Sequence, residues 1–196
     1  MHWKDYDWFS IFDWFKKHPK AFATFATKYA NHKLLEYKPE GKIRVRLSMM
    51  PETIRKKVES GTSPIVKRIE FLNKAIEAGY STHINFSPVI YYDGWEKDYI
   101  ELFKKISQET SNDFKKQCGS EVIFLTHNES LHKINLKKGL TSQEELMWKP
   151  DIQDKKISNY GGNNVRYSYE LKKELVKKFE NIHNEYLDFS QLRYIF

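Results

Sequence analysis

The stretch 82–95 constrains the fold of this chain more than any other segment. Its first part, Thr82–Ile90, is rich in apolar and β-branched residues and lies between the turn-forming Gly79 and Asp93-Gly94. A short apolar run bounded by turn residues is typical of a buried strand. The segment therefore predicts a central strand that ends at a polar Ser87-Pro88 step.

A helix is expected on each side of this strand. Before it, apolar residues recur at helical spacing over 65–76, with Ser63 as the N-cap and Pro64 at the first helical position. After it, Asp93 and Glu96 have the D-x-x-E spacing of a capping box that begins the next helix. The strand is thus the middle of an α-β-α unit.

Helices and strands alternate through the first two thirds of the chain. Further strands are predicted over residues 21–27, 42–48 and 121–125, and further helices over 7–17, 51–59 and from about 129. Such alternation favours parallel strands joined by right-handed crossovers. We therefore expect an α/β fold whose sheet is open or barrel-like.

The last third of the chain has a different pattern. It comprises a polar segment at 140–157, a Gly-rich turn with short strands at 160–169, a Lys/Glu-rich helix at 171–186 and a short strand at 192–196. We therefore divide the chain into an α/β body, residues 1–139, and a small C-terminal extension, residues 140–196.

Cysteine and histidine content exclude several kinds of site. The single cysteine, Cys118, excludes an intrachain disulfide and a cluster built on several thiolates. His127 and His132 are five residues apart, which would put them on different faces of a helix, so His127 is interpreted as structural and no metal ligand is assigned. No run approaches ~20 apolar residues and the N-terminus has no signal-peptide pattern, so no membrane span is expected and the expected setting is cytoplasmic.

Polar side chains follow the predicted strands where they end. Lys28, Ser48, Ser87 and the triplet at 126–128 occupy such positions. In parallel α/β folds, ligands bind outside the carboxyl ends of the strands, so these residues could form a pocket for a carboxylate, a ribose or a phosphate. Strand ends that are polar only because they meet water are the alternative.

Positive charge is concentrated in the later part of the chain. The net charge is +7, and residues 133–178 contain 11 Lys/Arg against 6 Asp/Glu, a net of +5. The turn at 159–169 combines Gly and Asn with Arg166 and tyrosines, so it could contact phosphates while its aromatic rings stack on bases. A solvated lysine-rich surface and a purely structural turn are the alternatives.

A series of short motifs runs from about Trp8 to Phe196. It comprises T-F-A-T-K at 24–28, R-V-R-L-S at 44–48, E-S-G-T-S-P at 59–64, A-G-Y at 78–80, F-S-P-V-I at 86–90, D-G-W at 93–95, Y-G-G at 160–162 and R-Y at 166–167. In order and spacing this series resembles spore photoproduct lyase and its relatives, which are radical S-adenosylmethionine (SAM) enzymes. Residues 124–128 and the tail resemble the broader lyase-like branch more than the spore enzyme proper.

The resemblance implies a partial (β/α)6 barrel of the radical SAM type, of which residues 1–139 are the C-terminal half. In the complete family enzyme it implies SAM and a [4Fe-4S] cluster at the strand ends, and repair of pyrimidine photoproducts in DNA. The residues that match cofactor positions are Lys28, Ser48 and Ser87. Those that match a region associated with DNA contact are Tyr160, Arg166 and Tyr167.

One part of the family pattern is absent from this sequence. The C-x-x-x-C-x-x-C motif that holds the cluster does not occur, and Cys118 cannot replace it. We therefore expect the chain by itself to ligate no cluster and to be inactive, with a half that carries the motif as its partner; no catalytic residue is assigned. An uncovered half barrel also predicts self-association through the strand at 21–27. The alternatives are a non-catalytic nucleic-acid-binding module and a radical SAM enzyme with a non-DNA substrate.

Overall fold

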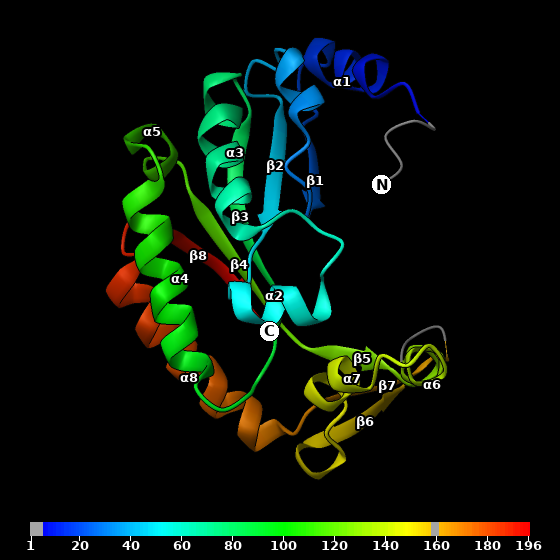
Figure 1. The fold of residues 1–196 in the computed structure, drawn as a ribbon. Coiled ribbons are helices and arrows are strands. Elements are labelled where there is room, and N and C mark those ends of the chain that lie inside the picture. Colours follow the sequence, from blue (N-terminus) through cyan, green and yellow to red (C-terminus); the bar gives the residue numbers. More distant parts are fainter. Residues whose placement is uncertain (1–5, 158–160) are drawn as a thin grey trace.

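The computed structural model of the protein describes residues 6–157 and 161–196. It contains a five-stranded sheet in the order β1-β2-β3-β4-β8 and a three-stranded sheet in the order β5-β7-β6. Figure 1 shows the smaller sheet beyond the carboxyl ends of the strands of the larger one.

The larger sheet is parallel throughout, which confirms the predicted α/β class. Its strands are β1 (Ala23–Thr27), β2 (Ile43–Ser48), β3 (Ser81–Val89), β4 (Gly119–Phe124) and β8 (Gln191–Ile195). The register between β3 and β4 shifts between Phe86 and Val89, where Pro88 lacks the N–H group that a regular ladder needs.

Helices cover one face of this sheet, here called the outer face. α3 (Ile65–Glu77), α4 (Trp95–Glu109) and α8 (Tyr169–Tyr186) lie side by side on it, with α4 packed against both neighbours (Figure 1). The other helical elements of this part of the molecule are α1 (Trp8–Lys17), η2 (His32–Glu36), α2 (Glu52–Val58) and α5 (Asn112–Lys115).

Alternation along the strands sends apolar side chains toward these helices. In β2, Ile43, Val45 and Leu47 are fully buried, whereas Arg44 and Arg46 between them point to the opposite face. Because the outer face is closed by helices and the alternate face is polar, β2 has the pattern of a strand in the wall of a barrel.

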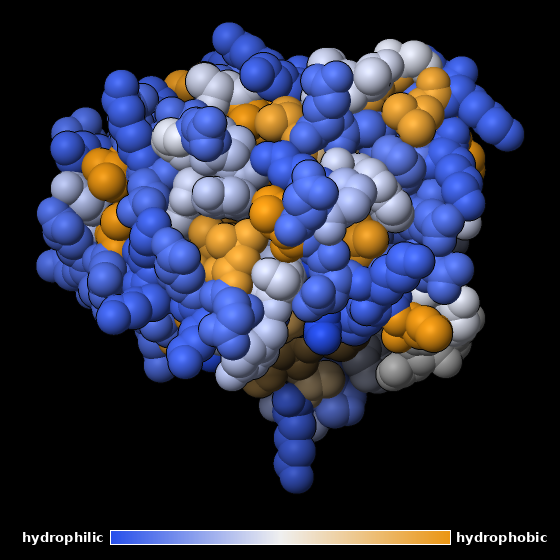
Figure 2. Space-filling view, turned by 90° about the horizontal axis from the view of Figure 1, so that it is seen from below, coloured by the Kyte–Doolittle hydropathy of each residue, from blue (hydrophilic) through white to orange (hydrophobic). Residues whose placement is uncertain are grey.

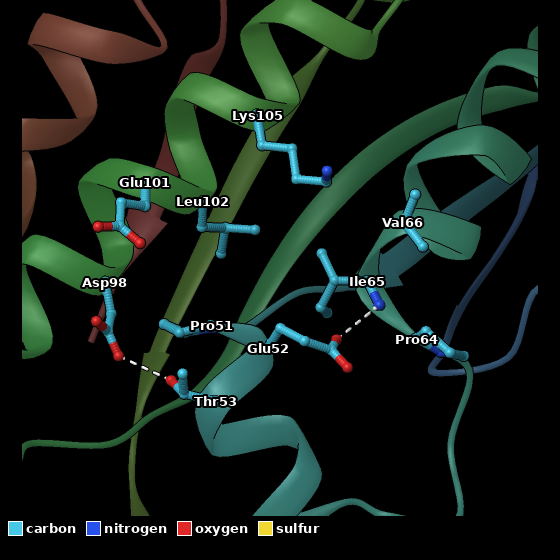
Figure 3. Close-up of a pocket in the computed structure, with 10 residues that line it drawn as sticks. All are labelled: Pro51, Glu52, Thr53, Pro64, Ile65, Val66, Asp98, Glu101, Leu102 and Lys105. Atoms are coloured by element: carbon cyan, nitrogen blue, oxygen red, sulfur yellow. Dashed lines mark hydrogen bonds between the residues drawn. The ribbon is translucent and has the colours of Figure 1, made fainter.

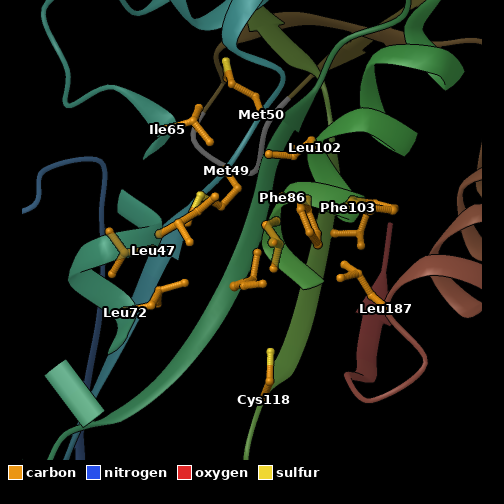
Figure 4. Close-up of a cluster of buried hydrophobic side chains, with 14 of the residues drawn as sticks. Leu47, Met49, Met50, Ile65, Leu72, Phe86, Leu102, Phe103, Cys118 and Leu187 are labelled. Carbon is orange, nitrogen blue, oxygen red and sulfur yellow. The ribbon is translucent and has the colours of Figure 1, made fainter. Parts of the chain in front are cut away.

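The core lies between the outer face and the helices. Figure 4 shows Leu47 and Phe86 from the strands beside Leu72 and Phe103 from the helices. Phe86 is the centre of an aromatic cluster, with its ring centroid 5.1 Å from that of Phe103 and 5.6 Å from that of Phe179 in α8. The predicted central strand is therefore confirmed, and α8 completes the core above it.

The opposite face of the larger sheet, here called the inner face, is polar. Parallel register aligns Thr24 with Arg44 and Ser81, and Ala26 with Arg46 and His83, in rows across three strands. On β1 the inner-face side chains of Thr24 and Ala26 are exposed. A row of arginine, histidine and hydroxyl groups on an open sheet face is suited to a polar ligand rather than to further packing.

The smaller sheet is antiparallel and is enclosed by short helices. Its strands are β5 (Thr126–Asn128), β7 (Asn163–Tyr167) and β6 (Gln153–Ile157), and its helices are α6 (Glu129–Lys137), α7 (Thr141–Met147) and η3 (Pro150–Ile152). Two hydrogen bonds to the backbone of Tyr91 tie it to the larger sheet. The Tyr91 N–H donates to the Tyr167 hydroxyl at 2.7 Å, and Lys149 Nζ donates to the Tyr91 carbonyl at 2.9 Å.

The two sheets do not divide the chain at residue 139. β5 and α6 lie before that residue but belong to the smaller sheet, while α8 and β8 lie after it and belong to the larger one. β8 pairs with β4, so the chain returns to the barrel at its end. The polar segment 140–157 contains α7, η3 and β6.

Both predicted helix caps are wrong. α4 begins at Trp95 with Gly94 as its N-cap at φ 84°, a conformation that favours glycine, so Asp93 does not cap it and the Asp93–Glu96 capping box does not form. α3 begins after Pro64, and the hydroxyl of Ser63 accepts a hydrogen bond from the Ala30 N–H at 3.0 Å instead. Ser63 therefore ties the segment after β1 to the start of α3.

The surface at the carboxyl ends of the strands is mainly hydrophilic. Figure 2, which views the molecule from this end, shows hydrophobic residues there in small separate patches. None of the described helices combines the length and the apolar character that crossing a bilayer requires.

Candidate functional site

An ion-pair network joins the carboxyl ends of β1 and β2. Lys28, which follows β1, pairs with Glu59 Oε1, and Glu59 Oε2 lies 3.3 Å from Arg68 Nη2. The Glu59 side chain is 7% exposed and that of Arg68 is completely buried. The E-S-G-T-S-P motif therefore folds back over the strand ends and places its carboxylate between two cations.

Arg68 fixes the backbone around this carboxylate. Its Nη1 donates to the Ser48 carbonyl at 2.5 Å, its Nε to the Ser63 carbonyl at 2.8 Å and its Nη2 to the Thr62 hydroxyl at 2.5 Å. Burial lowers the pKa of Arg68, opposed by the charge of Glu59, but a guanidinium stays protonated in proteins. Arg68 thus links Ser48 to the network that contains Lys28, although neither the charge pattern nor the spacing had indicated Arg68.

Asn85 adds an unsatisfied polar atom beside Ser48. The two residues are register partners on the inner face of β2 and β3. Asn85 is 7% exposed, and its Oδ1 is buried with no hydrogen-bond partner among the described residues. A buried acceptor without a donor is uncommon in proteins and requires an explanation such as a bound group. Ser87, half-buried, follows two residues later on the same face.

A second carboxylate organises the centre of the inner face. Glu121 of β4 accepts hydrogen bonds at Oε2 from Arg46 Nη1 at 2.6 Å and from the Tyr194 hydroxyl at 2.7 Å. Burial raises the pKa of Glu121, but the hydrogen bonds from Tyr194 and Arg46 together outweigh it and hold that pKa below its usual value. Glu121 is therefore an anion that neutralises part of the arginine row.

His83 lies in the same row and is kept neutral. Burial, followed by the charges of Arg44 and Arg193, lowers its pKa from 6.5 to about 4. Arg193 Nη1 lies 3.2 Å from His83 Nδ1, which is consistent with a neutral ring that accepts at that nitrogen. His83 can thus accept a proton or a hydrogen bond at neutral pH, but it does not carry a charge there.

Three cations cluster where the smaller sheet meets the start of α8, close to the inner face. Lys156 and Arg166 lie with Lys172 around a cavity of about 80 Å³ that is also lined by Ile123 and Phe196. Burial and the charges of Arg166 and Lys156 lower the pKa of Lys172. None of the ion pairs within the described residues involves these three cations, although Asp154 lies opposite Arg166 in the register. The cluster can therefore take an anion such as a phosphate.

The three residues predicted for nucleic-acid contact have different positions. Tyr160 lies outside the described residues. Arg166 is exposed on β7, whereas Tyr167 is 1% exposed and accepts a hydrogen bond from the Tyr91 N–H. The burial of Tyr167 argues against base stacking by its ring, because packing against the larger sheet already covers it.

The structure also places Cys118 and His127, the cysteine and the histidine considered from the sequence. Cys118 is buried, and burial raises the pKa of its thiol to about 12, which fits an unreactive side chain. His127 lies on β5 rather than on a helix, and it meets His132 of α6 at the carboxylate of Glu144 of α7. The sequence had no signal for this meeting, because the three residues lie on three different elements.

A cavity of about 400 Å³ lies elsewhere, between α2, α3 and α4 (Figure 3). Around it, Glu52 accepts a hydrogen bond from the Ile65 N–H at 3.0 Å, and the Thr53 hydroxyl donates to Asp98 at 2.8 Å. None of the residues predicted to bind a cofactor lines this cavity. The strand-end network, with its orphaned Asn85 acceptor, is therefore the better candidate for a site.

Comparisons with known proteins agree on one family. The family model for spore photoproduct lyase matches residues 8–196. The chain is 37% identical over 101 residues to the spore photoproduct lyase of Bacillus subtilis, a match that covers 50% of this chain and 29% of that protein. It is 26% identical over 184 residues to the enzyme of the same name from Clostridium acetobutylicum, covering 93% of this chain and 53% of that protein.

A solved structure shares the fold. A mutant of spore photoproduct lyase with bound AdoMet and dinucleoside spore photoproduct superposes with a TM-score of 0.82 at 21% identity, covering 95% of this chain and 55% of that one. The half-barrel fold implied by the sequence motifs is thus confirmed. Where the match includes most of this chain, the chain spans about half the length of the related protein. Because the family model matches nearly the whole sequence, this chain belongs to the spore photoproduct lyase family.

Proposed function

We propose that the chain provides the C-terminal half of a radical SAM enzyme that acts on pyrimidine photoproducts in DNA. The observation that carries the proposal is the strand-end site, where Lys28 and Ser48 are joined through Glu59 and Arg68 beside the orphaned acceptor of Asn85. The family match and the AdoMet bound in the similar structure support SAM as the ligand of this site.

The donors and acceptors of the site fit the polar parts of SAM. The Lys28 ammonium uses one of its three donors on Glu59 and keeps 37% of its side chain exposed, so it can also bind the carboxylate of a ligand. Ser48, Asn85 and Ser87 offer hydroxyl and amide groups for a ribose or an amino group. When bound, SAM supplies the radical chemistry of this family.

The cluster does not fit the residues present. A [4Fe-4S] cluster requires several cysteine thiolates, whereas Cys118 is single, buried and holds its proton at neutral pH. We derive no step through a cluster on this chain and infer that its ligands come from a C-x-x-x-C-x-x-C segment outside it.

The cation cluster of Lys156, Arg166 and Lys172 is the proposed DNA contact. Its charges have no carboxylate partners within ion-pair distance among the described residues, so phosphates could replace the water around them. The cavity between these cations also borders Ile123 and Phe196 at the end of the larger sheet. A strand of DNA on the cluster would therefore lie close to the inner face.

The catalytic proposal is tested on the chain joined to an upstream half that carries the cysteine motif. After anaerobic reconstitution, we expect 5′-deoxyadenosine from SAM and conversion of a dinucleoside spore photoproduct. Asn85→Ala should raise the KM for SAM roughly tenfold, in line with the loss of about one hydrogen bond. Asn181→Ala, at an exposed position of α8, should leave it unchanged. Absence of SAM cleavage in a joined protein with a full complement of iron would contradict the proposal.

Binding of nucleic acid without catalysis is the second candidate function, favoured by the same unpaired cations. We expect a fluorescein-labelled DNA duplex to bind the chain with an affinity that falls steeply with salt. Arg166→Gln should weaken binding and reduce the salt slope by about 1. Lys97→Gln, at a lysine whose side chain is 80% exposed on α4, is the matched control. Binding that does not depend on salt would exclude this function.

A further inference from the structure

Three residues with metal-binding side chains converge in the smaller sheet, away from the strand-end site. His127 Nε2 lies 2.9 Å from Glu144 Oε2, and His132 Nδ1 lies 2.5 Å from the same oxygen. The potential ligand atoms of the three side chains all lie within 4.8 Å of one another. Glu144 is 2% exposed and His127 is 7% exposed, so the group is enclosed rather than spread over a surface.

The separations between these atoms are somewhat shorter than those around a tetrahedral zinc ion. Zn²⁺ binds imidazole nitrogen at about 2.0–2.1 Å and carboxylate oxygen at about 2.0–2.2 Å, which puts tetrahedral ligand atoms roughly 3.3–3.5 Å apart. The two N···O separations in the cluster are 0.4–1.0 Å shorter than that, as expected where protons rather than a cation lie between the atoms. A small outward movement of the helix-borne His132 and Glu144 would open the required space.

Neighbouring residues hold two of these side chains in orientation. Asn135 Nδ2 donates to the second oxygen of Glu144 at 2.6 Å, which leaves Oε2 directed at the histidines. The Trp148 ring stacks on the His132 ring, with centroids 4.2 Å apart and an interplanar angle of 11°. Such outer contacts fix the tautomer and ring orientation of metal ligands, and their loss commonly costs 10–100-fold in affinity.

A hydrogen-bonded structural cluster is the competing explanation. The carboxylate could simply accept protons from both rings and from Asn135, with no metal needed. An anionic carboxylate flanked by two imidazoles is equally the charge state that a divalent cation requires.

We propose that His127, His132 and Glu144 bind one divalent transition-metal ion, with Zn²⁺ as the preferred cation. Two imidazoles and one carboxylate form a donor set found in zinc proteins, whereas Mg²⁺ and Ca²⁺ prefer sites made only of oxygen atoms. Each ring would bind through the nitrogen that now faces Glu144; that nitrogen would give up its proton, and the neutral ring would carry a proton on its other nitrogen instead. Three protein ligands leave a fourth position for water.

The ion would join β5, α6 and α7 next to the lysines of β6. Trp148, which stacks on His132, also lines a cavity of about 360 Å³ together with Lys155 and Lys156. A metal at the cluster would therefore fix the elements that support this cavity. Its expected role is structural, in a segment of polar sequence with few apolar contacts of its own.

The test uses the full chain without an affinity tag, treated with a chelator and then titrated with Zn²⁺ against a chromophoric competitor. We expect one Zn²⁺ per chain and a rise in Tm of about 5–10 °C when free Zn²⁺ is 100-fold above its Kd. Co²⁺ in place of Zn²⁺ should give the visible absorption of a tetrahedral site. A wild-type chain that binds less than a tenth of an equivalent of either ion overturns the proposal.

Variants locate the ion on these residues. Glu144→Gln keeps the shape of the side chain and should abolish stoichiometric binding, and His132→Gln should do the same. Asn135→Ala should weaken binding by 10–100-fold. His32→Gln, in distant η2, is the control and should bind as the wild type does. Circular dichroism verifies that each variant is folded, and full Zn²⁺ binding by folded Glu144→Gln and His132→Gln would overturn the assignment.

Discussion

The two sheets of this protein treat their charged residues in opposite ways. In the larger sheet several cations have carboxylate partners: Lys28 and Arg68 share Glu59, and Arg46 pairs with Glu121. In each case the carboxylate is at least 93% buried by its neighbours. These pairs hold side chains and backbone in place, so they prepare a site of fixed geometry.

At the junction of the smaller sheet and α8, by contrast, three cations have no such partner among the residues that the structure describes. The three cations are Lys156, Arg166 and Lys172, which line one cavity. Burial lowers the pKa of Lys172, and the charges of Arg166 and Lys156 lower it further. A bound anion stabilises such a cluster, and this stabilisation becomes weaker as the salt concentration rises. In the proposed function, the paired charges therefore orient a small ligand, and the unpaired charges attract the DNA backbone.

The strongest test of this contrast removes the buried cation of the larger sheet. Arg68→Ala removes one of the two cations that pair with Glu59 and the guanidinium donor to the carbonyls of Ser48 and Ser63, so the free energy of unfolding should fall by about 3–5 kcal/mol. Urea unfolding followed by circular dichroism measures the loss.

The neighbouring lysine is the matched control. Lys67 is a cation on the same helix, but its side chain is 60% exposed and pairs with Glu70 at the surface. Lys67→Ala should therefore change stability by less than about 0.5 kcal/mol. Equal effects of the two substitutions would mean that the buried network contributes nothing beyond surface charge.

A pH titration tests the inner face next. His83 has a folded pKa of about 4 against 6.5 unfolded, so between these values the unfolded chain binds a proton that the folded chain does not. Stability should thus fall by about 2–3 kcal/mol as pH drops from 6.5 to 4.

The contribution of His83 can be separated from that of other groups. His183 is also buried with a lowered pKa and acts in the same direction, so His83→Gln should reduce the slope of stability against pH without abolishing it. The comparison is cleanest above about pH 5.5, where the carboxylates are largely ionised in both states. An unchanged slope in His83→Gln would show that the arginine row does not hold this ring neutral.

Much of the larger sheet could be predicted from sequence because its strands are specified by the pattern of apolar residues within each segment. Apolar alternation in 42–48 and the apolar run at 82–90 identified β2 and β3, and strand ends identified Lys28 and Ser48. Arg68 and Asn85 could not be found in this way. Both lie inside apolar patterns, and their roles arise only when register and helix packing bring them to the strand ends.

The smaller sheet was harder to predict. β6 has four exposed residues out of five, and α7 is a short polar helix, so neither has the periodicity that identifies an element. The meeting of His127, His132 and Glu144 depends on a strand and two helices that are placed by tertiary contacts. The tyrosine of the R-Y motif was interpreted as a surface group because sequence does not reveal which face of β7 is covered.

Adjacent residues of β7 offer a third test of the contrast. Tyr167→Phe removes the acceptor of the Tyr91 N–H and should cost about 1–2 kcal/mol of stability, with DNA binding unchanged once the protein is folded. Arg166→Gln should do the reverse, with weaker DNA binding and a change in stability below about 0.5 kcal/mol. Anisotropy and urea unfolding on both variants measure the two effects. A loss of DNA binding in folded Tyr167→Phe would indicate that Tyr167 contacts DNA after all.

The smallest expected effect concerns β1, one of the two edge strands of the larger sheet. β1 pairs with β2 on one side only, and its inner-face residues Thr24 and Ala26 are exposed, so the edge can pair with another chain. We expect self-association that rises with protein concentration in sedimentation velocity. Thr24→Lys should weaken it about tenfold, roughly 1.4 kcal/mol, because charge on an edge strand opposes pairing. Thr141→Lys, the same change at the exposed start of α7, should not. Equal weakening by both substitutions would mean that association depends on the net charge of the chain. A wild-type chain that stays monomeric would show that β1 does not mediate self-association.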